Sequence, residues 1–159
     1  MAIEKLYIQK ITNSDTESET KETGSDFGFY GMEIPFMMQA EAKEPSRNDW
    51  KDEDGDDEYI PQNGLRIQAF EIEIKLGYKG SKDTANAKLE AFLKYLTGRD
   101  GSGARMKIYS TYTKIGYNEV RFVSISDDAE LVRDTDGDIL IVTITLKVND
   151  PVTKVVLGS

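Results

Sequence analysis

The feature that most constrains the fold of this chain is a two-residue alternation of apolar and polar side chains. It is clearest in residues 65–78 (LRIQAFEIEIKLGY), where it changes phase partway, and it returns in residues 106–112 and 119–126. Alternation of this period is typical of strands with one buried face, and a change of phase predicts a bulge or a bend. Residues 139–148 (ILIVTITLKV) are apolar on both faces at their start, which is typical of a central strand.

Shorter segments complete the predicted sheet. Residues 3–12 are expected to form a short strand, residues 129–133 a short strand or an extended linker, and residues 27–42 a strand that Pro35 interrupts. Because proline cannot donate a hydrogen bond to a ladder, the interrupted strand belongs at an edge or a bulge. The expected turns are residues 113–118, residues 134–138 and residues 149–151, the last of which ends the central strand and leaves residues 152–159 as a C-terminal arm.

A single amphipathic helix is predicted between these strands. In residues 85–98 apolar side chains recur every three or four positions, residues 81–84 offer N-terminal caps, and Gly98 suits the C-terminal cap. Its apolar face would pack on the sheet. The predicted fold is therefore mainly β (α+β), an antiparallel β-sandwich or barrel with one flanking α-helix, forming a single domain over residues 1–159.

Two polar segments are predicted to be mobile loops. Residues 13–26 contain no large apolar side chain, and residues 43–64 include seven acidic residues between positions 49 and 58. The acidic run resembles a calcium loop of the EF-hand type but lacks its glycine and its final glutamate, so we expect neither a metal ion nor another cofactor. The chain has 29 acidic and 20 basic residues, and the whole excess lies in its first half.

The composition excludes several classes of function. The chain has no cysteine and no histidine, which rules out thiol nucleophiles, histidine bases and the usual zinc sites. An acidic chain without a basic cluster repels phosphates, so we expect no sequence-specific nucleic-acid binding and no membrane binding. Its acidic residues cluster in loops rather than on rigid elements, so we expect no enzyme. The start of the chain lacks the apolar stretch of a signal peptide, which predicts cytoplasmic synthesis.

The order of the elements resembles a family of phage tail proteins. The resemblance lies in the helix KLEAFLKYLTG (residues 88–98), the hairpin MKIYSTYT…YNEVRFVSIS (residues 106–126) and the sequence ILIVTITLKVNDP (residues 139–151). Between residues 27 and 154 the chain is similar to the N-terminal domain of distal tail proteins of long-tailed bacteriophages, and to related tail tube proteins.

This resemblance implies a structural phage or prophage tail protein that forms a ring, most often a hexamer, with other phage tail proteins as partners. Such a subunit resides in the host cytoplasm during assembly and then in the virion tail. The resemblance leaves open whether the ring belongs to the tail tube or to the distal hub. An acidic lumen would give DNA nothing to adhere to during its passage.

Exposed strand edges, both chain ends and aromatic or methionine-rich segments are candidates for contacts between subunits or with partners. The candidate residues are Leu6, Ile8, Phe36, Met37, Met38, Trp50, Tyr59, Val152, Val155 and Leu157. The alternative function is a non-catalytic carbohydrate- or surface-binding β-sandwich module that uses Trp50, Tyr59 and the nearby acidic residues as its platform.

Overall fold

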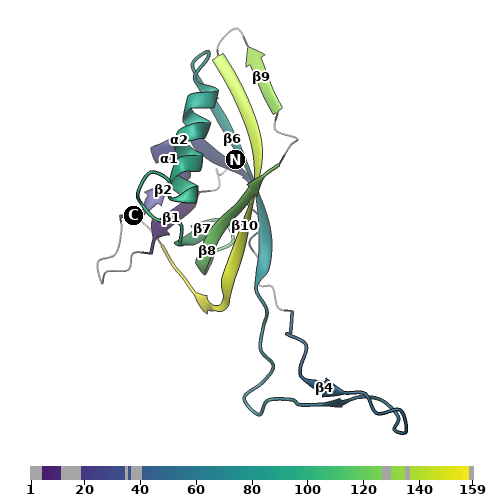
Figure 1. The fold of residues 1–159 in the computed structure, drawn as a ribbon. Helices are drawn as coiled ribbons and strands as arrows, with labels where there is room; N and C mark the ends of the chain where they lie inside the picture. Colours follow the sequence, from purple (N-terminus) through teal and green to yellow (C-terminus); the bar gives the residue numbers. More distant parts are fainter. Residues whose placement is uncertain are drawn as a thin grey trace.

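One curled antiparallel sheet forms the body of the molecule, with its helices on the concave side (Figure 1). The computed structural model describes residues 5–11, 19–34, 36, 41–126, 130–134 and 137–157. The strands of the sheet are β1 (Leu6–Lys10), β2 (Lys21–Glu22), β3 (Phe29–Glu33), β6 (Phe70–Gly80), β7 (Met106–Ser110), β8 (Ile115–Ile125), β9 (Glu130–Asp134) and β10 (Gly137–Lys154). Their order is β2-β1-β7-β8-β10-β6-β3, and β9 pairs with β10. The prediction of a mainly antiparallel β fold is confirmed, in the form of a single half-barrel sheet.

Strand β10 lies at the centre of this sheet, as its apolar sequence predicts. It pairs with β6 from Asp138 to Val148, while its other edge pairs with β9 and then with β8. Alternate side chains of β10, β6 and β8 therefore point into one core. The largest fully buried side chains are Phe29, Phe36, Phe92, Leu6, Ile8, Ile74, Leu76, Leu96, Met106, Ile108, Ile144 and Leu146.

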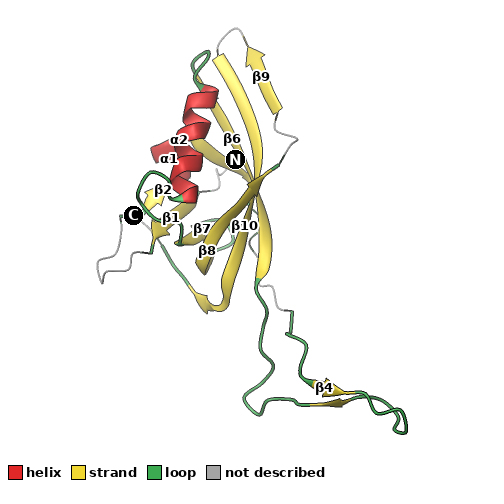
Figure 2. Cartoon of the chain, viewed as in Figure 1, coloured by secondary structure: helices red, strands yellow, loops and turns green. Residues whose placement is uncertain are grey.

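The predicted helix is α2 (Ala85–Thr97), which fills the concave side of the sheet (Figure 2). Its apolar stripe buries Phe92, Tyr95 and Leu96, and it ends at Gly98 in the left-handed conformation, with φ of 76°. At its start Thr84 makes no side-chain capping bond to the helix; its hydroxyl instead bonds to the hydroxyl of Tyr78 at 2.9 Å.

A second, short helix corrects the prediction of a loop over residues 13–26. Residues 21–27 form β2 and the helix α1 (Thr23–Phe27), while residues 13–18 lie outside the part of the chain that the structure describes. The Phe27 ring stacks on that of Phe92 with centroids 5.2 Å apart, so α1 packs against α2. This aromatic contact stabilises a helix in a segment whose polar composition predicts a loop.

Three element boundaries differ from the prediction. Strand β6 begins at Phe70, so the change of phase marks its start and not a bulge inside a longer strand. The hairpin turn between β7 and β8 falls at residues 111–114, earlier than expected. Strand β10 does not end at residues 149–151 but continues to Lys154 after an irregularity in its pairing with β8.

Residues 41–69 leave the body as a long projection, which we call the hairpin arm (Figures 1 and 2). Its two sides pair only over β4 (Arg47–Asn48) and β5 (Asp57–Glu58), with one further bridge between Ala42 and Ile67. The segment predicted as a loop over residues 43–64 is thus an extended hairpin. Its base adjoins the start of β6.

Candidate functional site

The hairpin arm gains almost nothing from its own fold. None of its residues is buried, and a two-stranded hairpin is marginal in water. Arg47 forms exposed ion pairs with Asp56 at 2.8 Å and with Glu44 at 3.4 Å, which raise the pKa of its guanidinium, but ion pairs exposed to solvent stabilise a fold little. Segments that bury little apolar surface gain little free energy from folding on their own.

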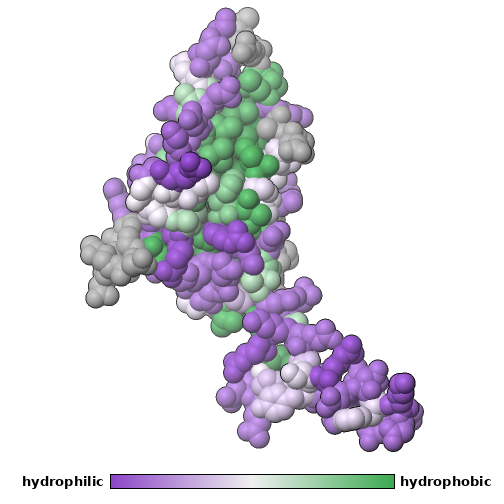
Figure 3. Space-filling view, viewed as in Figure 1, coloured by the Kyte–Doolittle hydropathy of each residue, from purple (hydrophilic) through white to green (hydrophobic). Residues whose placement is uncertain are grey.

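The surface of the arm combines acidic and large apolar side chains. Most of it is hydrophilic (Figure 3), yet Trp50 is 51% exposed and Tyr59 is 72% exposed. Tyr59 lines a shallow hollow with β4 and β5, and Trp50 does not line it, so the two aromatic residues do not form one platform. Exposed aromatic side chains on a projecting segment are typical of a contact surface.

The end of the sheet where β10 begins, which is uppermost in Figure 1 and is called the upper sheet below, is bordered on each side by a strand with a neighbour on only one edge. Here the order is β9-β10-β6-β3; within the described residues β3 pairs only with β6, and β9 only with β10. Both outer strands carry exposed apolar side chains, namely Tyr30 and Met32 on β3 and Leu131 and Val132 on β9. Strand edges of this kind are templates for another chain's strand.

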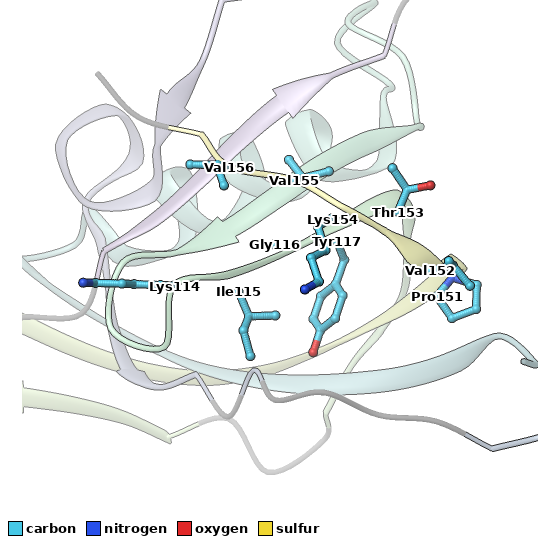
Figure 4. A pocket seen from close by; sticks show the side chains of 10 residues that line it. All are labelled: Lys114, Ile115, Gly116, Tyr117, Pro151, Val152, Thr153, Lys154, Val155 and Val156. Carbon is cyan, nitrogen blue, oxygen red and sulfur yellow. The ribbon is translucent and has the colours of Figure 1, made fainter.

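A groove lies at the opposite end of β10, between the start of β8 and residues 151–157, which we call the C-terminal extension (Figure 4). Its volume is about 180 Å³, and its walls include Ile115, Val152 and Val156. Lys114 and Lys154 line it too, and Lys107 lines the hollow on the other side of the extension. No described acidic side chain lines either one, although the Asp150 carboxylate accepts hydrogen bonds from lining residues of both.

Two local devices hold the C-terminal extension in place. Gly116 lies directly under the Val155 carbonyl, where a Cβ atom would overlap the oxygen. The carboxylate of Asp150 accepts hydrogen bonds from the backbone N–H groups of Val152 and Thr153, both at 3.2 Å, and from Asn118 at 3.0 Å. Hydrogen bonding, above all from the Thr153 side chain, lowers the pKa of Asp150 to about 2.

A buried lysine fixes the end of α2 to β1. The Lys10 ammonium donates to the Tyr95 carbonyl and, at 2.6 Å, to the Gly103 carbonyl, and it lies 4.4 Å from the centre of the Tyr95 ring. Burial lowers its pKa to about 8, although the nearby carboxylate of Asp100 acts in the opposite direction. Both of these hydrogen bonds go to backbone carbonyls at and just after the end of α2, so this lysine stabilises the end of the helix.

The structure separates the residues predicted from sequence into four groups. Leu6, Ile8 and Phe36 are buried in the core, so their prediction as assembly surface is wrong: a place near a chain end or in a methionine-rich segment suggests exposure, but these side chains point inward. Met37 and Met38 lie outside the described residues. Trp50 and Tyr59 project on the arm. Val152, Val155 and Leu157 come together at the C-terminal extension, where Val152 is 70% exposed and Val155 is buried.

Sequence reasoning missed the apolar edge residues and the lysines of the groove. Leu131 and Val132 are adjacent apolar residues in a short strand, and one of any such pair must point outward, which was a usable signal. The lysines gave none. Lys114 and Lys154 are forty residues apart in sequence and line one groove only because β8 and β10 pair.

Comparisons with known proteins add no relative to this picture: no family model, no curated protein and no solved structure matches the chain. Among the described residues, no helix is long and apolar enough to span a membrane. Within the same residues, no group of three acidic side chains is placed to hold a metal ion.

Proposed function

We propose that this chain is a structural subunit that assembles with copies of itself into a ring, as the resemblance to phage tail proteins implies. The observation that carries the proposal is the pair of strands, β3 and β9, that border the upper sheet. Each is paired on one side and exposes large apolar side chains, so the two edges can join from copy to copy. Repetition of such a head-to-tail contact gives a closed ring or a filament.

The strand directions support this contact. Neighbours alternate in direction across β9, β10, β6 and β3, so β3 and β9 run in opposite directions. Copies related by rotation about an axis along the strands would then place β3 beside the next β9 in antiparallel orientation. Antiparallel pairing is the geometry already used throughout the sheet, and it requires no change in either strand.

The charge distribution bears on the acidic lumen of such a ring. Fourteen of the 29 acidic residues and five of the 20 basic residues lie in residues 13–26 and 41–69, so the rest of the chain is electrically neutral. The outer face of the upper sheet carries both signs, for example Glu73 beside Lys75. In our proposal the acidic residues of these two segments outside positions 49–58 supply the lining past which DNA moves in a tail tube or hub.

The mass of the protein in solution tests the ring. Light scattering after size-exclusion chromatography should show a species of several copies of 17.9 kDa, near 107 kDa for about six copies. Charges placed on the two edges, Met32→Lys together with Val132→Lys, should yield monomers because lysine blocks edge pairing. Tyr112→Lys, at an exposed turn residue away from both edges, is the matched control and should assemble normally. A monomer at every concentration, or normal assembly of the edge variant, contradicts the proposal.

The exposed aromatic residues of the arm favour one second candidate, a carbohydrate- or surface-binding module without catalytic activity. Trp50 is the single tryptophan, so its fluorescence reports on the arm directly. Titration with soluble glycans should then shift the emission, and Trp50→Ala should remove both shift and binding. An unchanged spectrum across a glycan panel rejects this candidate and leaves the ring.

A further inference from the structure

We infer that the lysine-bordered groove at the C-terminal extension binds the acidic tip of the hairpin arm, residues 49–58, from a second copy of the chain. This inference rests on the proposed self-assembly and names a second contact within it. It concerns different residues from the edge contact of β3 and β9. Its two halves, the groove and the arm tip, are both present in every subunit.

The groove has the chemistry of a receptor for an acidic segment with an apolar anchor. Its walls are apolar, with Ile115, Val152 and Val156 contributing side chains, and Lys114 and Lys154 lie at its border (Figure 4). Val152 and Val156 are 70% and 79% exposed, so they lose much contact with water when the groove is filled. An occupant therefore needs an apolar group for the walls and negative charge for the ammonium groups.

The arm tip supplies both parts within a few residues. Trp50 is half exposed and stands next to Asp49, and the rest of the tip carries six more acidic residues against Lys51 alone. Aromatic side chains are common anchors at protein interfaces, and the surrounding carboxylates would steer the tip toward the lysines. No other described segment combines an exposed tryptophan with such a charge.

The contact must be made between copies. The arm and the C-terminal extension leave the same end of the sheet and run apart from each other (Figure 1), and no arm residue lines the groove of its own chain. Because every copy has one arm and one groove, the contact is again head-to-tail and can repeat around a ring or between stacked rings. The arm would then gain in the assembly the burial that it lacks alone.

Disulfide trapping tests this contact directly, because the chain has no cysteine of its own. One full-length variant carries Lys51→Cys at the arm tip, which keeps all seven acidic residues, and the other carries Val156→Cys at the groove. Mixed under mild oxidation, they should form a heterodimer on a non-reducing gel. Lys88→Cys, exposed on α2 away from the groove, is the matched control partner and should give only background.

Charge reversal then separates specific binding from random collision. Lys114→Glu with Lys154→Glu in the groove variant should lower the yield of heterodimer about tenfold, and Asp52→Lys with Asp54→Lys in the arm variant should restore it. Equal trapping by Val156→Cys and Lys88→Cys, or a yield unaffected by charge reversal, overturns the inference. Binding of duplex DNA by the groove lysines without any heterodimer would overturn it too.

The outcome is distinguishable from failure of the proposed function. If light scattering shows an oligomer that the edge variant abolishes but no heterodimer is trapped, the ring stands and the groove contact is wrong. If the heterodimer is trapped while no closed oligomer forms, the groove contact stands and the ring is wrong. A monomer without trapping contradicts both.

Discussion

Gly116→Ala is the substitution that most directly tests how the C-terminal extension is held. The new Cβ atom would overlap the Val155 carbonyl oxygen and would lie 2.9 Å from the Ile108 carbonyl oxygen. Both neighbours are backbone, and the Ile108 carbonyl belongs to β7 inside the sheet. The extension at Val155 is the part that can give way, so it should lift away from β8.

The expected loss of stability follows from what the extension buries. Exposing Val155, which is 9% exposed in the folded chain, costs about 2 kcal/mol. The lower entropy of the unfolded chain after a Gly→Ala change returns about 0.4–1 kcal/mol. The net destabilisation is then about 1–1.5 kcal/mol, which lowers the melting temperature by about 3–5 °C in a domain of this size.

The assay combines thermal unfolding with hydrogen exchange of the backbone amides in residues 152–157. Gly77→Ala is the matched control, because its Cβ would meet only the Sδ and Cγ atoms of Met32, at 2.9 and 3.3 Å, and a flexible methionine can move. The control should keep the melting temperature and the exchange rates of the native protein. An unchanged melting temperature and unchanged exchange in Gly116→Ala would refute the reasoning.

Three further predictions concern the core and the two perturbed ionisable groups. Phe92→Ala, which removes a fully buried ring that stacks on Phe27, should lower the free energy of unfolding in urea by about 3–5 kcal/mol. Asp150 has a folded pKa of about 2 against its ordinary 3.8, so its contribution to the free energy of unfolding is present above about pH 4 and is lost as the pH falls toward 2. Allowing for solvent screening, Asp150→Asn should lower the free energy of unfolding by about 1 kcal/mol at neutral pH. It should also weaken the loss of stability between about pH 4 and pH 2. Lys10 has a folded pKa of about 8 against 10.5, so the folded state releases its proton first. The free energy of unfolding should rise between about pH 8 and pH 10.5, and Lys10→Met should abolish the rise.

The sequence predicts the secondary structure well where one periodicity persists over a whole element. The central position of β10, the helix ending at Gly98 and the edge position of the strand before Pro35 all follow from such local patterns. These predictions succeed because each depends on which face of a strand or helix is buried. Which face is buried can be read from the apolar pattern of consecutive residues.

Elements that exist because of distant contacts are not predictable in this way. Helix α1 is polar in sequence and forms beside α2 because Phe27 has an aromatic partner in Phe92. Strand β10 passes Pro151 because Asp150 gathers two backbone N–H groups and Asn118 around one carboxylate, which bends the strand without ending it. In both cases the deciding partner is far away in sequence or depends on a turn geometry that composition does not specify.

The contrast between body and arm is the strongest physical argument for assembly. The body buries a continuous core to which β1, β3, β6, β7, β8, β10 and α2 contribute, and this burial offsets the entropy of ordering its backbone. The arm buries none of its residues, while fixing each backbone residue costs about 1–2 kcal/mol. Two exposed ion pairs, a two-residue ladder and one isolated bridge do not offset that cost for residues 41–69. In the proposed head-to-tail assembly, each copy would provide a surface that covers the arm of the next and so would offset this cost.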